Sequence, residues 1–142
     1  MRYLLGILLF CLPVSALGWS TPDRGTATRA ALMDALRPHA EWQLGAPVVF
    51  VVSDLRVQGD VAFGNLRATR AGGGEIDLYR TPDYRRGLID PEYMDGPRYQ
   101  ALFRRSGDTW VAVHWALGAT DAWWYNPEFC PLWQSVIPEV CG

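Results

Sequence analysis

The sequence has no lysine, so all 13 basic residues are arginines, and it has only two histidines and three cysteines. It also lacks the common catalytic signatures: a G-x-S-x-G nucleophile turn, a phosphate-binding glycine loop with its lysine, and a zinc-binding H-E-x-x-H. The glycine run Gly72–Gly74 has no strand-to-helix context and indicates a flexible loop. These absences weigh against an enzyme, and we expect no cofactor and no metal site.

The charge of the chain does not indicate a nucleic-acid or membrane partner. The formal net charge is −2, and acidic and basic residues are mixed along the chain. Neither a basic patch for nucleic acid nor a cationic surface for membranes is predicted. No apolar run beyond the first 20 residues is long enough to cross a bilayer, so no membrane span is expected in the mature chain.

The N-terminus has the layout of a signal peptide. Arg2 precedes an apolar run, Leu4–Leu12, which is followed by a proline and by small residues. This run is shorter than the ~20 residues of a membrane-spanning helix. Cleavage after Gly18, or after Ala16, satisfies the small-residue rule. We therefore expect residues 1–18 to be removed and residues 19–142 to form a single exported domain, periplasmic or extracellular.

Removal of the signal peptide leaves an even number of cysteines. Cys11 lies inside the apolar run, directly after Phe10, which does not suit a lipoprotein cleavage site. Cys130 and Cys141 remain, and in an oxidising compartment they predict one disulfide. A zinc site is disfavoured because the two thiols are far apart in sequence and have no nearby histidine.

The most regular helical pattern covers Thr26–Arg37. Alanines and leucines recur there at helical spacing, with charged residues off that stripe. Pro38 is expected to end or kink the helix. The pattern leaves room for a further turn at His39–Leu44, before Gly45.

Two β-rich pairs follow. Val48–Val57 and Val61–Ala68 predict a hairpin with a two-residue Gly59-Asp60 turn, which pairs Val57 with Ala62, Leu55 with Gly64 and Ser53 with Leu66. Asp54, Arg56, Asn65 and Arg67 then share the other face, and Phe63 is left exposed. In the second pair, around Ser106-Gly107-Asp108, an odd-length loop pairs Phe103 with Val111, Ala101 with Val113 and Tyr99 with Trp115. That register places Leu102, Trp110, His114 and Arg104 on the opposite face.

The element order predicts an α+β fold, with an N-terminal helix packed on an antiparallel sheet built from two hairpins. Residues 69–97 form an irregular excursion between the hairpins, in which Ile76–Tyr79 is a possible short strand. Residues 119–142 are expected to form a C-terminal flap pinned by the disulfide, with Thr120 or Asp121 capping a turn. The same order of elements is found in cystatin-like and NTF2-like folds.

Several blocks carry a resemblance to a known family: GGGEIDLYRTPDY, DGPRYQALFRRSGDTWVAV and LGATDAWW. Together with the helix and GAPVVFVVSDLRVQGDVAF, they resemble a family of small, exported, functionally uncharacterised proteobacterial proteins. The resemblance implies a periplasmic α+β domain. It implies no activity and transfers no catalytic residue.

Two groups of residues are candidates for function. His114 titrates near working pH, and with Asp54 and Asp121 it could form a polar pocket of the NTF2-like type, for a small-molecule binder or enzyme. The alternative for His114 is an ordinary polar residue on a half-exposed face.

The second group lies in the excursion and consists of tyrosines and arginines: Tyr79, Arg80, Tyr84, Arg85, Arg86 and Tyr93. Such residues are favoured at protein-binding hot spots, and arginines also clamp anions. The alternative is a solvated loop in which the arginines pair with neighbouring acids. We expect a non-enzymatic domain that binds a protein or cell-envelope component.

Overall fold

A computed structural model describes residues 18–142, so the expected signal peptide lies almost wholly outside the described residues. Helix α1 (Ala27–Leu44) begins at Thr26, whose hydroxyl accepts a hydrogen bond from the amide of Arg29, and ends at Gly45. Pro38 lies inside the helix on its exposed side and does not end it. The predicted further turn is therefore present, because water can hydrate the carbonyl that proline leaves without a donor.

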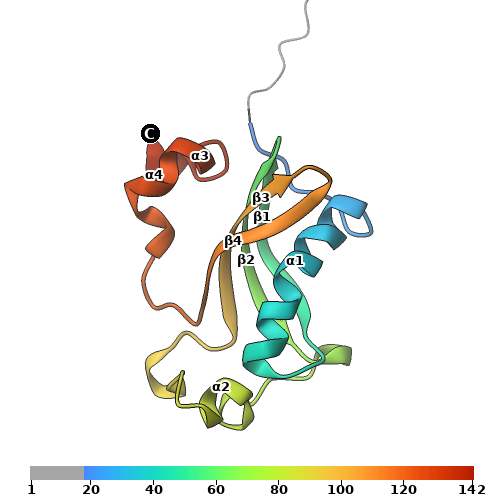
Figure 1. Ribbon diagram of the computed structural model, residues 1–142, viewed down its shortest axis with the longest axis vertical. Coiled ribbons are helices and arrows are strands. Elements are labelled where there is room, and N and C mark those ends of the chain that lie inside the picture. Colours follow the sequence, from blue (N-terminus) through green and yellow to red (C-terminus); the bar gives the residue numbers. More distant parts are fainter. Residues whose placement is uncertain (1–17) are drawn as a thin grey trace, which may run out of the picture.

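A four-stranded antiparallel sheet carries the rest of the regular structure, in the order β1-β2-β3-β4. The strands are β1 (Val49–Gln58), β2 (Val61–Thr69), β3 (Arg98–Ser106) and β4 (Thr109–Leu117). Helix α1 covers one face, and the C-terminal flap, with α3 (Cys130–Trp133) and α4 (Pro138–Cys141), lies at the other (Figure 1). The predicted α+β class is confirmed.

The first hairpin has the predicted two-residue turn. Val57 pairs with Ala62 and Leu55 with Gly64, and Gly59 has a positive φ whereas Asp60 does not, as in a type II′ turn. A β-bulge makes Ser53 the extra residue, so Val52, not Ser53, pairs with Leu66. Between the bulge and the turn the expected facing holds, with Leu55 and Val57 in the core, but on the other side of the bulge it is reversed, so Phe50 and Val52 pack against the core and Val51 is exposed.

The second hairpin corrects the predicted register. Its turn is the two-residue Gly107-Asp108, because Ser106 pairs with Thr109, and it has no odd loop. Further along, a bulge at Val113 shifts the strand pairing by one residue. Phe103 therefore pairs with Ala112, but Leu102 pairs with His114. The bulge turns Trp110 and Trp115 to the same side, against α1. The prediction failed because it assumed unbroken alternation along the strand.

The two-residue turn reverses the expected burial of β4 between Trp110 and Val113, and the bulge returns Trp115 to the predicted core side. Val111 and Val113, predicted to be core residues, are exposed, whereas Trp110 is buried. On the flap side, Phe63 and Leu102 are buried, although the sequence indicated an exposed Phe63 and a polar face. The flap covers them, which strand alternation alone does not reveal.

The excursion between β2 and β3 contains only single turns of helix. These are η1 (Ala71–Gly73), η2 (Leu78–Arg80), α2 (Pro82–Arg85) and η3 (Pro91–Tyr93). The possible strand at Ile76–Tyr79 does not form, because Asp77 accepts a hydrogen bond from the amide of Tyr79 and starts a helical turn there.

The C-terminal flap forms a second small core on the sheet. Its turns are η4 (Trp123–Tyr125), η5 (Pro127–Phe129), α3 (Cys130–Trp133) and α4 (Pro138–Cys141). Neither Thr120 nor Asp121 occupies the cap position of η4, which is Ala122. The predicted Cys130–Cys141 disulfide is present, with an S–S distance of 2.09 Å. Residues from the flap and the sheet share this core: Val61, Phe63, Leu102, Phe129, Trp133, Val136 and Ile137.

Candidate functional site

The excursion is fixed to the body of the protein by side chains that point inward. Ile76 and Leu78 join the main core, and Thr81 is buried with its hydroxyl donating to the carbonyl of Leu78 at 2.7 Å. The Thr81 hydroxyl also accepts from the amide of Tyr84, which starts α2. The excursion is thus an ordered segment despite its lack of long elements.

Asp83 is the most unusual residue of the excursion, because its carboxylate is almost fully buried. Its Oδ1 forms an ion pair with Nη2 of Arg86 at 2.9 Å, without the alignment of a hydrogen bond. The same arginine donates to the carbonyl of Trp42 and lies 4.5 Å over the Trp42 ring. Since Trp42 is in the last turn of α1, Arg86 ties the excursion to the helix.

The buried Tyr99 hydroxyl connects the Asp83 region electrostatically with the main core. Tyr99 is fully buried on β3 and donates a hydrogen bond to Gln43 at 3.0 Å. Burial raises the pKa of its hydroxyl, and the negative charge of Asp83 acts in the same direction. The buried carboxylate therefore lies within electrostatic reach of the core, which makes Asp83 and Arg86 structural residues.

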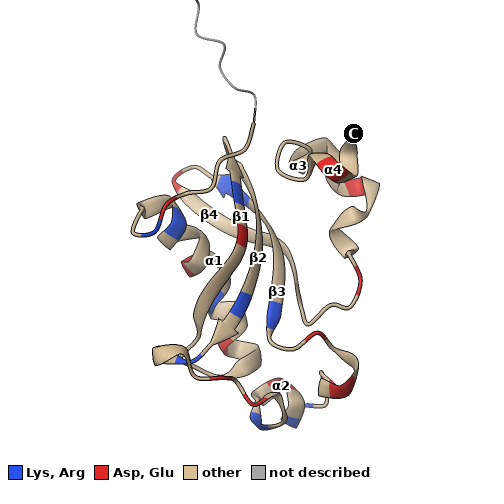
Figure 2. Ribbon diagram, turned by 180° about the vertical axis from the view of Figure 1, so that it is seen from behind, with Lys and Arg blue, Asp and Glu red and all other residues tan. Residues whose placement is uncertain are grey.

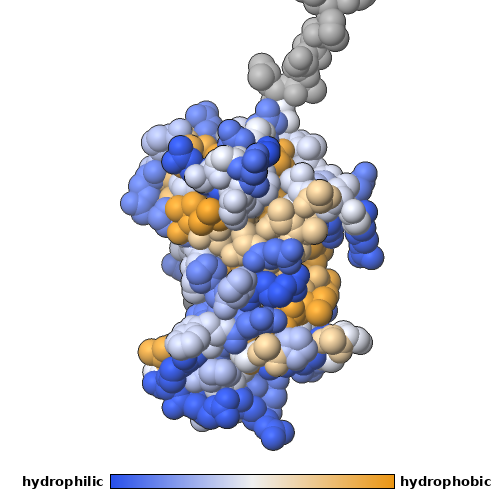
Figure 3. All heavy atoms as spheres, turned by 45° about the vertical axis from the view of Figure 1, so that its right-hand side comes forward, coloured by the Kyte–Doolittle hydropathy of each residue, from blue (hydrophilic) through white to orange (hydrophobic). Residues whose placement is uncertain are grey.

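Outward, the excursion presents a group of large side chains to solvent. The exposed fractions are 51% for Tyr79, 41% for Tyr84, 66% for Leu88 and 79% for Tyr93, and Trp42 of α1 is 71% exposed. This end of the molecule, at the bottom of Figure 1, is mainly hydrophilic on the side shown in Figure 3. Exposed charged residues alternate with these aromatics along the segment, namely Arg80, Arg85, Asp90 and Glu92, as in interfaces that also remain stable in water.

The sequence-predicted binding residues divide into two kinds. Tyr79, Tyr84 and Tyr93 are exposed, as a binding surface requires. Arg80 and Arg85 are exposed and form no ion pair among residues 18–142. Figure 2 shows arginines on α2 and acidic residues on the segments that lead into and out of it. Two further exposed residues, Trp42 and Leu88, were not predicted from the sequence. Trp42 belongs to the helical pattern, which gave no sign of its exposure, and the only sign for Leu88 was a lone apolar residue after a glycine.

The predicted polar pocket is not assembled. Asp54 lies on β1 and His114 on β4, at opposite edges of the sheet, and Asp121 is exposed in the connection after β4. The His114 ring instead lies beside two flap aromatics, with centroid distances of 5.0 Å to Phe129 and 5.5 Å to Trp133. The structure does not bring these three residues together.

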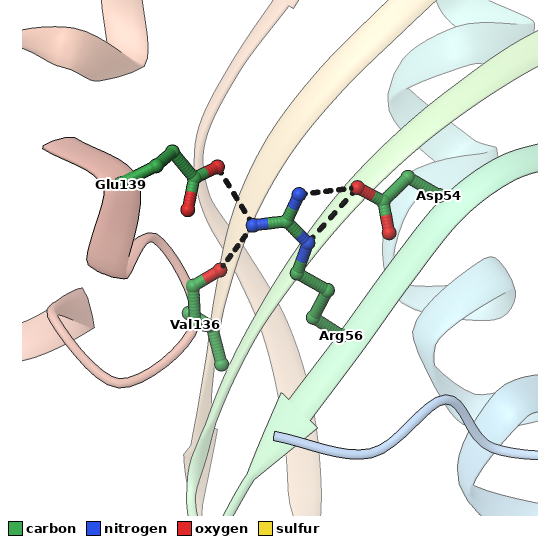
Figure 4. Close-up of polar contacts among 4 residues, drawn as sticks. All are labelled: Asp54, Arg56, Val136 and Glu139. Atoms are coloured by element: carbon green, nitrogen blue, oxygen red, sulfur yellow. Dashed lines mark hydrogen bonds and ion pairs between the residues drawn. The ribbon is translucent and has the colours of Figure 1, made fainter. Parts of the chain in front are cut away.

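Asp54 has a different partner, which holds the flap on the sheet (Figure 4). Arg56, on β1, forms ion pairs of 2.7 Å with both Asp54 and Glu139, and donates to the carbonyl of Val136 at 3.1 Å. Burial lowers the pKa of Arg56, but the hydrogen bonds and charges of the two carboxylates outweigh it and raise the pKa overall. Asp54 therefore orients a structural arginine.

The N-terminal segment meets the same arginine. Ser20 forms a two-hydrogen-bond bridge with Val57, and the Arg56 guanidinium lies 4.9 Å from the centre of the Trp19 ring. The disulfide itself lies entirely within the flap. The flap is therefore attached to the sheet by Arg56, by its buried apolar residues and by the Trp133 indole, which donates to the carbonyl of Phe103 at 2.8 Å.

No group of histidine, cysteine or acidic side chains in residues 18–142 is arranged to hold a metal ion. The helices of the same residues include none with the length and apolar character needed to cross a membrane. No family model, no curated protein and no solved structure matches the chain. The resemblance to uncharacterised exported proteins stays a prediction.

Proposed function

We propose that this chain is an exported, non-enzymatic domain that binds a protein of the cell envelope through its excursion. The observation that carries the proposal is the exposure of Tyr79, Tyr84, Leu88 and Tyr93 on a segment whose other side is anchored in the core. Large aromatic side chains exposed at one end of a domain are typical of binding surfaces.

The anchoring favours binding because it lowers the cost of ordering. A loop that is already fixed by capping hydrogen bonds and by the ion pair of Arg86 with the buried Asp83 loses little conformational freedom when a partner arrives. The disulfide supports the expected export, since such bonds persist in oxidising compartments. The cystatin-like or NTF2-like topology remains part of the proposal and supplies no chemistry.

Leu88→Asp is the variant that tests the surface most cleanly. It places a charge on an exposed residue that makes no hydrogen bond through its side chain, so folding is expected to be unaffected. Leu132→Asp is its matched control, because Leu132 is also exposed but lies on the flap. Arg86 is unsuitable, since its removal leaves the buried Asp83 carboxylate without its ion-pair partner.

The measurement is chemical cross-linking of purified residues 19–142 to cell-envelope extract, followed by identification of the linked proteins. We expect a linked protein with the wild-type chain and with Leu132→Asp, and its loss with Leu88→Asp. Identical linked proteins from all three chains would remove the excursion from the proposal.

A further inference from the structure

The tyrosines of the excursion form the wall of an open hollow. The rings of Tyr79 and Tyr84 meet edge to face, with centroids 5.3 Å apart and planes at 74°. The hollow has a volume of about 760 Å³ and is lined by these tyrosines and by the segment after α2: Gly87, Leu88, Ile89, Asp90 and Glu92. It therefore combines aromatic faces with carboxylates.

The charge of this lining is of one sign. Asp90 and Glu92 line the hollow, and no arginine does. Partial desolvation, and then the negative charges of Glu92 and Asp90, raise the pKa of Tyr79, so both carboxylates lie within electrostatic reach of its hydroxyl. An anion in this hollow would be repelled, which argues against the anion-clamp alternative at this position.

Within the described part of the chain, residues 18–142, no cation lies over this tyrosine pair. Among residues 18–142, arginine guanidinium groups lie over the rings of Trp19, Trp42, Phe50 and Phe63, but over neither Tyr79 nor Tyr84. Arg80 and Arg85 are sequence neighbours of the pair and do not line the hollow. The aromatic and acidic groups are thus available to a cation from outside.

We propose that the hollow binds an arginine or lysine side chain of the partner protein, with the cation beside the tyrosine rings and near Asp90 and Glu92. This inference rests on the proposed function and specifies the chemistry of the partner. A cation over an exposed aromatic ring gains about two- to fivefold in affinity, and a nearby exposed carboxylate adds a similar factor.

The backbone already holds these groups in place. Asp77 Oδ1 accepts from the amide of Tyr79 at 3.1 Å, and Asp90 Oδ1 accepts from the amide of Glu92 at 3.1 Å. Each of these aspartates accepts its backbone hydrogen bond through Oδ1, which fixes the orientation of the carboxylate and of its second oxygen, Oδ2. The partner's side chain then bears most of the ordering cost, and the hollow bears little.

The test uses two fluorescently labelled peptides, hexa-arginine and hexa-citrulline, and measures anisotropy during titration with the folded chain at physiological salt. Citrulline has nearly the shape of arginine without its charge. We expect saturable binding of the arginine peptide and about fivefold or greater weakening for the citrulline peptide. Equal affinity for the two peptides would overturn the inference.

Matched variants distinguish an effect of net charge from an effect of the site itself. Asp90→Asn/Glu92→Gln is expected to weaken arginine binding about fivefold, and asparagine keeps the capping oxygen at position 90. Asp60→Asn/Asp121→Asn removes the same charge at exposed positions away from the hollow and is expected to leave binding unchanged. An equal loss in both double variants would show binding by net charge alone and would also overturn the inference.

A third variant examines the aromatic wall. Tyr79→Leu/Tyr84→Leu keeps all charges and is expected to weaken arginine binding about threefold, with an unchanged unfolding midpoint as evidence of folding. The results are distinct from those of cross-linking. A chain that loses its partner on Leu88→Asp but does not distinguish arginine from citrulline refutes the cationic site and leaves the proposed function standing.

Discussion

The flap and the excursion are similar in sequence character, but their aromatic side chains differ in burial. Both are irregular, carry prolines at the starts of short helical turns, and are rich in aromatic residues. Yet Phe129 and Trp133 of the flap are buried, whereas Tyr79, Tyr84 and Tyr93 of the excursion are exposed. The number of aromatic residues in a segment therefore does not decide whether they are buried or exposed.

What decides it is the surface that lies beneath. The flap meets an apolar patch on the sheet, formed by Val61, Phe63 and Leu102, and buries its aromatics there. The tyrosines of the excursion pack against each other and beside acidic residues. The four changes below test this difference, beginning with the one that should alter stability most.

Trp133→Ala should be the most damaging change, because it opens a cavity under the flap and removes the hydrogen bond to the Phe103 carbonyl. We expect a loss of about 3–5 kcal/mol in the free energy of unfolding, measured with urea. Tyr93→Ala in the excursion is the control and should change the same quantity by less than about 0.5 kcal/mol. Equal losses from the two would contradict the contrast.

Removal of the disulfide by Cys130→Ser/Cys141→Ser should cost about 3 kcal/mol, because the open chain gains conformational entropy on unfolding. The bond spans 11 residues within the flap. The sheet and excursion are expected to keep their structure, which hydrogen exchange of their backbone amides measures. Unchanged thermal unfolding of the double variant would show that the disulfide does not stabilise the flap.

Arg56→Met should weaken the attachment of the flap by about 1–2 kcal/mol, since both ion pairs and the hydrogen bond to Val136 are lost while the apolar stem is kept. Arg104→Met is the matched control, because Arg104 is exposed on β3 and forms no ion pair in the described chain. Urea unfolding compares the two variants. If they lose the same free energy, the ion-pair network of Figure 4 does not hold the flap.

Leu88→Ser should be the mildest change, within about 0.5 kcal/mol of the wild-type free energy of unfolding, because its side chain is already in water. Leu102→Ser makes the same substitution beneath the flap, where we expect a loss of several kcal/mol. Thermal unfolding of the pair measures the difference. A large loss from Leu88→Ser would mean that the excursion buries this residue in solution.

The sequence predicted local structure well and the contacts between distant segments poorly. The helix predicted over Thr26–Arg37, the turn at Gly59-Asp60 and the disulfide follow from neighbouring residues. The bulge at Val113 does not, because it places both Trp110 and Trp115 against a helix far away in sequence. The side of β4 that faces the core was consequently mispredicted from Trp110 to Val113 and predicted correctly at Trp115.

The candidate site shows the same limit. Its tyrosines were recognisable from composition, but the separation of Arg86 from the other arginines was not. That separation arises from a buried carboxylate and from the carbonyl of Trp42, which lies more than 40 positions earlier in the chain. Likewise, Asp54 and His114 were grouped by chemical type, although the strand order places them at opposite edges of the sheet.

The meeting of Trp19 and the flap at Arg56 has a consequence for handling the protein. It gathers the start of the described chain and the C-terminus at one end of the molecule, and the excursion lies at the other (Figure 1). A linker attached to either terminus would therefore present the tyrosine hollow away from its support. If the hollow binds as proposed, the same polarity suits the domain to multivalent display, in which many copies face outward and weak single contacts add up to firm attachment.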